Sequence, residues 1–173
     1  MTTRYDNTTI LLHWLSAALL LALWALGQTI DWFPSGSPRV LARSLHISTG
    51  VLLTVLLVYR LFWRSHGGIK LPPAASGWQQ TSAELLHKVL YLMLAVVLIL
   101  GLFNTWVRGD NLFDLFRLPS FAPGDKALRH QVEDLHGLAA NILLAMAACH
   151  AAAGLFHYFF LKDQVLQRMS WKK

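Results

Sequence analysis

Four long apolar stretches set what this chain can fold into. They cover about 10–30, 40–63, 85–107 and 135–161. Each is long enough for an α-helix to cross a hydrocarbon layer about 30 Å thick, which takes about 20 residues. Backbone polar groups find no water inside lipid, so each stretch has to form a helix. We therefore expect an all-α integral membrane four-helix bundle, with residues 1–173 in a single domain.

The composition agrees with a membrane protein and excludes several other classes. Of the 173 residues, 55% are hydrophobic and 14% are charged, whereas about 25% are charged in soluble domains. The net charge of +6 would suggest nucleic acid on a soluble protein, but here the charges flank the apolar stretches, so we expect no nucleic-acid partner. The single cysteine, Cys149, excludes an intrachain disulfide. The first stretch has no convincing cleavage site, so we expect a retained span rather than a signal peptide.

The placement of lysine and arginine predicts the orientation of the bundle. The side that holds both termini and the loop after the second stretch carries nine of the fifteen basic residues and three of the nine acidic residues. The opposite side carries six of each. Cytoplasmic loops of membrane proteins are enriched in Lys and Arg. We therefore expect both termini to be cytoplasmic.

The longest connection, Arg108 to Arg129, combines turn residues with apolar ones. It holds two glycines and two prolines, and also a short apolar segment made of Leu112, Phe113, Leu115 and Phe116. Amphipathic segments of this kind lie in the plane of the membrane surface. We therefore predict a short interfacial helix within this connection.

Four histidines stand inside the stretches at two depths. His136 and His150 are fourteen residues apart, close to four helical turns, so they share a helix face and are roughly 21 Å apart along the axis. His46 has the depth of His136, near the outer face, and His13 has the depth of His150, near the inner face. Ionisable residues inside a span are costly and usually functional. The pattern predicts a functional pair of histidines at each depth.

Small residues follow these four histidines by three or four positions, which leaves room for a flat cofactor one turn away. They are Gly50 after His46, Gly154 after His150, and alanines after His13 and His136. A fifth histidine, His87, is followed instead by the bulky Leu90 and Tyr91. We therefore leave His87 out of the ligand set.

Imidazole binds zinc, copper and iron alike, so the metal has to be chosen from geometry. Structural zinc needs four ligands that converge on one ion, and two histidines four turns apart on one helix cannot do this. Two ligands at each of two depths fit six-coordinate haem. We predict two haem b groups with axial pairs His46/His136 and His13/His150, an arrangement that favours electron transfer. The alternative is four buried histidines bonded to neighbouring carbonyls or hydroxyls.

A set of short motifs on the four stretches resembles the bacterial cytochrome b-561 family of four-helix di-haem, quinone-linked membrane proteins. The motifs cover nearly the whole chain and are Leu-His-Trp-Leu at 12–15, Leu-His-Ile-Ser-Thr-Gly at 45–50, Glu-Leu-Leu-His at 84–87, Leu-His-Gly at 135–137, His-Ala-Ala-Ala at 150–153, His-Tyr at 157–158 and Lys-Asp at 162–163. The resemblance implies the same haem pairs and a bacterial inner (cytoplasmic) membrane location. It is strongest to short stand-alone members that pass electrons from superoxide to ubiquinone.

The resemblance also implies a ubiquinone near the inner haem. His157 is the matching residue and the first candidate for a quinone contact, and either His157 or His87 could bond a quinone carbonyl or a haem propionate. The expected partners are the lipid bilayer, a quinone and a small-molecule electron donor. The loops are short and no docking tail is visible, so we expect no obligate protein partner.

An anionic donor such as superoxide would be drawn by positive charge on the outer side. The basic residues there are Arg39, Arg43, Arg108, Arg117, Lys126 and Arg129. Equal numbers of acids face the same side, so these cations could equally pair with acids or lipid headgroups. Two other functions stay open at this point: a haem b electron-carrier subunit of a larger respiratory dehydrogenase or hydrogenase, and a haem or metal transporter or purely structural membrane protein.

Overall fold

A computed structural model describes residues 4–112 and 115–171 of the chain. Its main elements are four long helices, α1 (Asn7–Thr29), α2 (Ser37–His66), α3 (Gly77–Arg108) and α4 (Lys126–Phe156). All four are long and apolar enough to cross a membrane, which confirms the predicted all-helical membrane fold. Helices α2 and α3 extend beyond the predicted apolar stretches at both ends. Helices α1 and α4 begin earlier than predicted and end at Thr29 and Phe156, before the predicted limits of 30 and 161.

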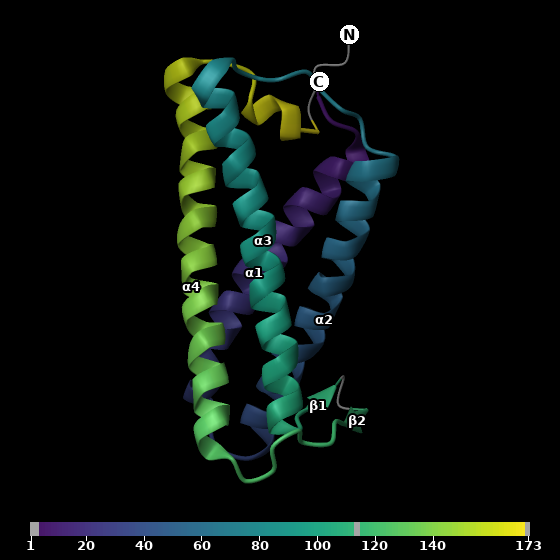
Figure 1. Cartoon of the computed structure of the whole chain (residues 1–173), viewed down its shortest axis with the longest axis vertical. Helices are drawn as coiled ribbons and strands as arrows, with labels where there is room; N and C mark the ends of the chain where they lie inside the picture. Colours follow the sequence, from purple (N-terminus) through teal and green to yellow (C-terminus); the bar gives the residue numbers. More distant parts are fainter. Residues whose placement is uncertain (1–3, 113–114, 172–173) are drawn as a thin grey trace.

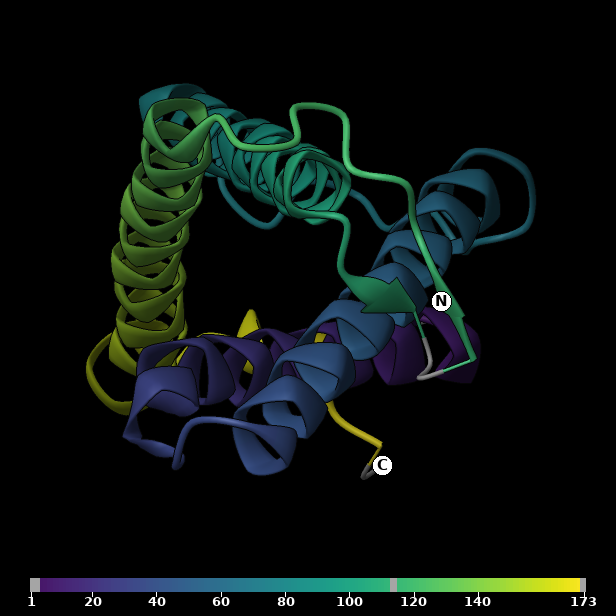
Figure 2. The ribbon, with the colours of Figure 1, turned by 90° about the horizontal axis from the view of Figure 1, so that it is seen from below.

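The helices follow one another around the bundle. In Figure 1 α3 and α4 run side by side and α1 crosses behind them at a slant, and contacts between α1 and α4 close the bundle. Figure 2 shows the bundle end-on. Helix α3 packs most closely on α4, and α1 on α2. As a result α2 and α4 lie on opposite sides of the bundle, which matters for the residues that face each other across it.

The interior at mid-height is apolar. One buried cluster consists of Leu23, Leu53, Leu57 and Leu98, and a second of Val97, Ala139 and Leu143. On α4 the second cluster lies between His136 and His150 in the chain. The outer surfaces of the helices also carry large exposed apolar side chains, such as Leu52, Leu92 and Leu138, as lipid-facing surfaces require.

Asp6 ties the start of α1 to the end of α2. Its carboxylate accepts hydrogen bonds from the backbone N–H and hydroxyl of Thr9 at 2.8 and 2.7 Å, from Nε1 of Trp63 at 3.0 Å and from the N–H of Ile69 at 3.1 Å. Burial alone would raise the pKa of Asp6, but these four hydrogen bonds lower it to about 2. Asp6 is therefore both the N-cap of α1 and a clamp between two helices.

Both ends of the described chain meet at the same end of the bundle (Figure 1). The N–H of Tyr5 donates to the carbonyl of Arg168 at 3.0 Å, and Nε1 of Trp14 donates to the carbonyl of Met169 at 2.9 Å. A short 3-10 helix, η3 (Leu166–Met169), carries these two carbonyls back to α1. The two termini therefore face the same side of the membrane, while the assignment of that side to the cytoplasm stays a prediction.

The predicted interfacial helix between Arg108 and Arg129 is wrong for the described residues. Two short strands, β1 (Asn111–Leu112) and β2 (Phe116–Arg117), pair antiparallel there instead. Gly109 has a left-handed conformation with φ of 69° that ends α3, and Nε of Arg117 donates to its carbonyl at 2.8 Å. The chain is thus folded back onto the end of α3. Phe113, part of the predicted helix, lies outside the described residues.

Candidate functional site

His46 of α2 and His136 of α4 face each other at the end of the bundle opposite the termini, which is called the outer end after its predicted orientation. Their ring centroids are 6.2 Å apart and their planes are inclined by 87°. Nδ1 of His136 lies 3.1 Å from the carbonyl of Val97 on α3. A carbonyl can only accept, so Nδ1 carries the proton and Nε2 keeps its lone pair for a ligand.

Each of these rings rests against a glycine on the neighbouring helix. A methyl group added at Gly27 of α1 would lie 3.1 Å from Cε1 of His46, and one at Gly101 of α3 would lie 3.0 Å from Cε1 of His136. Both distances are shorter than the carbon–carbon optimum of about 3.5–4.0 Å. Only glycine therefore lets the backbone approach the two rings this closely.

The same four-residue spacing recurs at both rings. Val97, whose carbonyl faces Nδ1 of His136, precedes Gly101 by four positions, and Leu23 precedes Gly27 in the same way. The buried Nδ1 of His46 makes no hydrogen bond of ordinary geometry within the described residues, although the backbone of Leu23 lies close enough to interact with it. Each outer ring thus has a helix carbonyl and a glycine one turn further on as its support.

The inner end brings three histidines together. His13 of α1 and His150 of α4 have ring centroids 6.2 Å apart with planes inclined by 78°. His87 of α3 is nearer to His150, with centroids 5.1 Å apart. Nη2 of Arg60 lies 3.0 Å from Nδ1 of His13. The structure therefore brings His87 close to the pair that the sequence singled out.

Two imidazoles that bind one metal ion from opposite sides have a separation set by bond lengths. With a metal–nitrogen bond of about 2 Å, the two ring centres are about 6 Å apart. Both 6.2 Å pairs fit this value, and the 5.1 Å between His87 and His150 is too short. Within the described residues no three His, Cys, Asp or Glu side chains gather to hold an ion by themselves. The donor set therefore suits a group, such as haem b, that brings its own equatorial nitrogens.

Open space beside His46 and His150 also suits a group such as haem b. A methyl group added at Gly50, one turn along α2, would meet nothing within 4 Å. Beside His150, a methyl group at Gly154 would touch only Cδ1 of Leu166, at 3.9 Å. Neither position is filled by packing, as a flat ring next to each histidine requires.

His157 stands two turns beyond His150, where α4 passes into a π-helical turn, η2 (His157–Leu161). Lys162 then takes a left-handed conformation with φ of 53°, which turns Asp163 back toward His157. Nδ1 of His157 and Oδ2 of Asp163 are hydrogen-bonded. Burial would raise the pKa of Asp163, but hydrogen bonds from His157 and from the N–H of Val165 hold it below its usual range.

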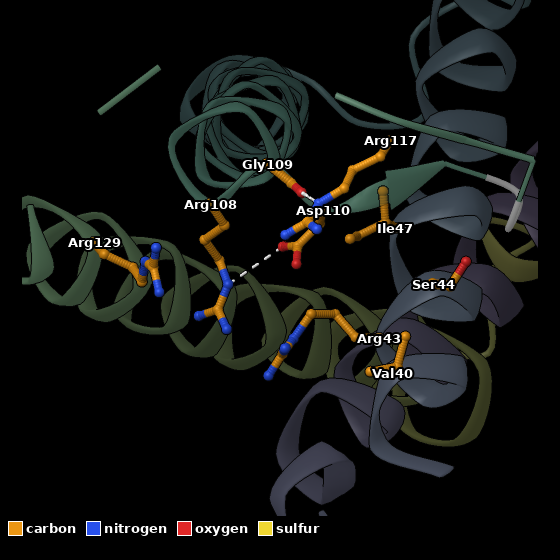
Figure 3. A pocket seen from close by; sticks show the side chains of 9 residues that line it. All are labelled: Val40, Arg43, Ser44, Ile47, Arg108, Gly109, Asp110, Arg117 and Arg129. Carbon is orange, nitrogen blue, oxygen red and sulfur yellow. Dashed lines mark hydrogen bonds and ion pairs between the residues drawn. The ribbon is translucent and has the colours of Figure 1, made fainter. Parts of the chain in front are cut away.

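Four arginines from distant parts of the chain line one cavity at the outer end. Its volume is about 340 Å³, and its lining consists of Val40, Arg43, Ser44, Ile47, Arg108, Gly109, Asp110, Arg117 and Arg129. In Figure 3 the side chains of Arg43, Arg108 and Arg129 approach the same space. Ile47 and Ser44 stand on either side of the outer ligand candidate along α2, so the cavity adjoins the outer histidine level.

The charges in this cavity are only partly balanced. Arg108 is 3.2 Å from the carboxylate of Asp110 and 2.8 Å from that of Glu133. Burial raises the pKa of Asp110, although the nearby arginines oppose that rise. Nε of Arg129 is buried without a hydrogen-bond partner among the described residues. The cavity therefore has an excess of positive charge.

The remaining outer cations lie elsewhere. Arg39 binds Asp31 at 3.6 Å and donates to the carbonyl of Phe33 at 2.8 Å. Lys126 opens α4 and does not line the cavity. Four of the six basic residues predicted to draw an anion are therefore gathered, and two are not.

Comparison with known proteins decides the family. A family model described as prokaryotic cytochrome b561 matches residues 4–172. The chain belongs to the prokaryotic cytochrome b561 family. This confirms the resemblance found in the sequence, and membership implies haem b and electron transfer in a membrane.

Several cytochrome b561 relatives match over almost their whole length. The chain is 32% identical to Cytochrome b561 homolog 1 of Escherichia coli K12, with 96% of each protein covered. It is 30% identical to Cytochrome b561 homolog 2 of the same organism, over 98% of this chain and 92% of the relative. It is 27% identical to a Yersinia pestis protein named probable superoxide oxidase CybB, over 98% and 97%.

The sequence analysis did not identify some of the residues that contact the histidine pairs. Gly27 and Gly101 were not singled out, although an isolated glycine inside an apolar span is typical of a close helix contact. Arg60 was counted only as a charge at a span end. Its contact with His13 joins positions 47 residues apart, so no local sequence pattern predicts this contact.

Proposed function

We propose that this cytochrome b561 protein is a superoxide:ubiquinone oxidoreductase of the bacterial inner membrane. Two superoxide anions each lose one electron and become O₂, and one ubiquinone takes up these two electrons and two protons to become ubiquinol. The name of the Yersinia pestis relative supports this reaction. The observation that carries it is the arginine-lined cavity beside the outer histidine pair.

His46 and His136 would hold one haem b, and His13 and His150 a second. Bound haem would supply reversible one-electron transfer, with two imidazoles holding each group. The carbonyl of Val97 fixes the tautomer and orientation of His136. Such support of a ligand by a neighbouring acceptor tunes the metal it binds.

The outer cavity attracts a small anion through its uncompensated charge. Among the described residues Arg43, Arg117 and Arg129 form no ion pair with a carboxylate, while Arg108 is balanced by two carboxylates. A cleft lined by one sign of charge raises the association rate of an oppositely charged substrate by about 10- to 1,000-fold. The arginines would therefore concentrate superoxide next to the outer ligands.

His157 and Asp163 would serve the quinone at the inner end. His157 can donate a proton to a quinone oxygen, and Asp163 holds the imidazole in place through Nδ1. His87 lies too near His150 for the two rings to bind one metal ion from opposite sides. His87 would therefore be a second contact for a quinone or a haem carboxylate.

The test uses purified protein alone, with a superoxide source and a water-soluble ubiquinone. Ubiquinol formation without any partner protein is the expected result. The double variant Arg43→Gln, Arg129→Gln should lower the second-order rate with superoxide about tenfold and weaken its dependence on salt. Arg39→Gln is the matched control, because Arg39 lies on the same side but is bonded to Asp31.

Two results would overturn the proposal. If protein that contains its full haem complement forms no ubiquinol from superoxide, the chain is a carrier that needs a partner. The relatives named only as cytochromes make that carrier the second candidate. If Arg39→Gln slows the reaction as much as the double variant, the cavity has no special part in it.

A further inference from the structure

Arg60 places a positive charge inside the span of α2, beside the inner histidines. It is partly buried, with Nη2 3.0 Å from Nδ1 of His13 and its guanidinium carbon 5.2 Å from the centre of the Tyr91 ring. The charge is therefore held between α1 and α3. Charged groups inside a span are expensive and normally have a partner of opposite charge.

No carboxylate among the described residues compensates Arg60. The acids at this end are Asp6, Glu84 and Asp163, and each of them bonds to other residues. The charged neighbour of Arg60 is Arg64, which is also positive. The inner histidine level thus has an unbalanced positive charge, which is destabilising until an anion binds.

The hydrogen bond to His13 is incompatible with metal binding by that ring. A guanidinium has only donors, so Nδ1 of His13 has to accept and the proton of the neutral ring sits on Nε2. A neutral imidazole that binds iron through Nε2 needs its proton on Nδ1 instead. Arg60 must therefore leave Nδ1 when His13 becomes a ligand, and its charge must find another acceptor.

Tyr91 offers a second donor at the same place. Its hydroxyl is buried and forms no hydrogen bond of ordinary geometry within the described residues, although it interacts with Arg60. A guanidinium and a hydroxyl side by side match a carboxylate, which accepts several hydrogen bonds and pairs with Arg in a bidentate way. The haem b expected here carries two carboxylates of its own.

We propose that Arg60, with the hydroxyl of Tyr91, binds a carboxylate of the inner haem, and that this exchange frees His13 to bind the iron. The inference rests on the proposed ligand pair His13/His150. It makes Arg60 a positioning residue that couples cofactor binding to the tautomer of a ligand. The proposal also predicts that the charge of Arg60 favours the reduced iron. Without Arg60 the negative carboxylate would be unpaired near the metal and would disfavour reduction.

The test measures the inner haem directly, independently of superoxide or quinone turnover. The inner haem is defined as the one whose absorbance is lost in His13→Ala. In an optical redox titration, Arg60→Gln should make its reduction at least tenfold less favourable, a downward shift of about 59 mV for one electron. Arg64→Gln is the matched control, because Arg64 is exposed one turn further along the same helix, and a shift under half that size is expected.

A second readout uses haem b whose two carboxylates are methylated, added to haem-depleted protein. The unmodified protein should retain native haem at the inner level at least tenfold better than the ester, and Arg60→Gln should retain both equally. Arg60→Lys keeps the positive charge at this position, so it serves as the comparison if Arg60→Gln does not fold. An unchanged inner potential in Arg60→Gln, or an undiminished preference for the native haem, overturns the proposal. If His13→Ala instead keeps both haems, the ligand assignment fails along with it.

Discussion

The close approach of Gly101 to His136 gives a sharp test of the outer site. In Gly101→Ala the new methyl group would lie 3.0 Å from Cε1 of His136, at least about 0.5 Å inside the carbon–carbon optimum. The ring cannot retreat without stretching its 3.1 Å contact with the carbonyl of Val97. Overpacking of this kind costs about 1–3 kcal/mol.

Gly137→Ala is the matched control. Gly137 is the chain neighbour of His136, and a methyl group there would meet nothing within 4 Å apart from its chain neighbours and its own helix backbone. Both substitutions gain up to about 1 kcal/mol of helix propensity, so the difference between them isolates the contact with the ring. Since 1.4 kcal/mol is a factor of ten, the outer haem should be held about 5- to 150-fold more weakly in Gly101→Ala.

The assay is the loss of the low-spin haem absorbance during dilution or heating in detergent, followed by a count of the haem that remains. If the chain binds two haems as proposed, Gly101→Ala should lose the outer one first, and the inner haem should be retained as in the unmodified protein. Equal retention of both haems in Gly101→Ala and Gly137→Ala would refute the reasoning, because the ring would then be free to move without cost.

Two other predictions concern the inner end of the bundle. Because hydrogen bonds hold the pKa of Asp6 at about 2, below its unfolded value of 3.8, its carboxylate stabilises the fold fully above about pH 5 and loses this effect as the pH falls toward 2. Both oxygens of Asp6 accept hydrogen bonds and an amide has one acceptor oxygen, so Asp6→Asn should cost about 1–3 kcal/mol at neutral pH. Thermal unfolding in detergent at several pH values should show the gap closing in acid, and a constant gap down to pH 2.5 contradicts it. His157→Gln should slow quinone reduction about 100-fold, as the loss of a general acid does, with both haem spectra intact. His66→Gln, an exposed histidine at the same end, is its control, and unchanged turnover in His157→Gln removes that residue from the mechanism.

The sequence was sufficient for the bundle and for the depths of the histidines because both follow from one-dimensional rules. Hydropathy marks a span locally, and the fixed rise of a helix converts the fourteen residues between His136 and His150 into a distance along the axis. The 6.2 Å distances within the two pairs agree with that prediction. Their role as haem ligands stays a proposal.

The contacts around the helices could not be predicted, because depth says nothing about rotation. Gly101 faces His136 only because α3 and α4 pack with one particular pair of faces. Arg43 and Arg129 are 86 residues apart and meet in one cavity. The interfacial helix was a wrong prediction since composition alone did not reveal that Gly109 would fold the chain back at Arg117.

The apolar layer between the two histidine levels has a consequence for membrane voltage. Residues 14–30, 47–59, 89–107 and 137–149 contain no Asp, Glu, Lys, Arg or His, so these segments offer no carboxylate, imidazole or amine to carry a proton alongside an electron from one level to the other. In the proposed orientation each electron would move inward as a bare negative charge, against an interior that is already negative. A full crossing costs about 2.3 kcal/mol per 100 mV, so an energised membrane would itself restrain turnover, and each turnover would help to charge that membrane.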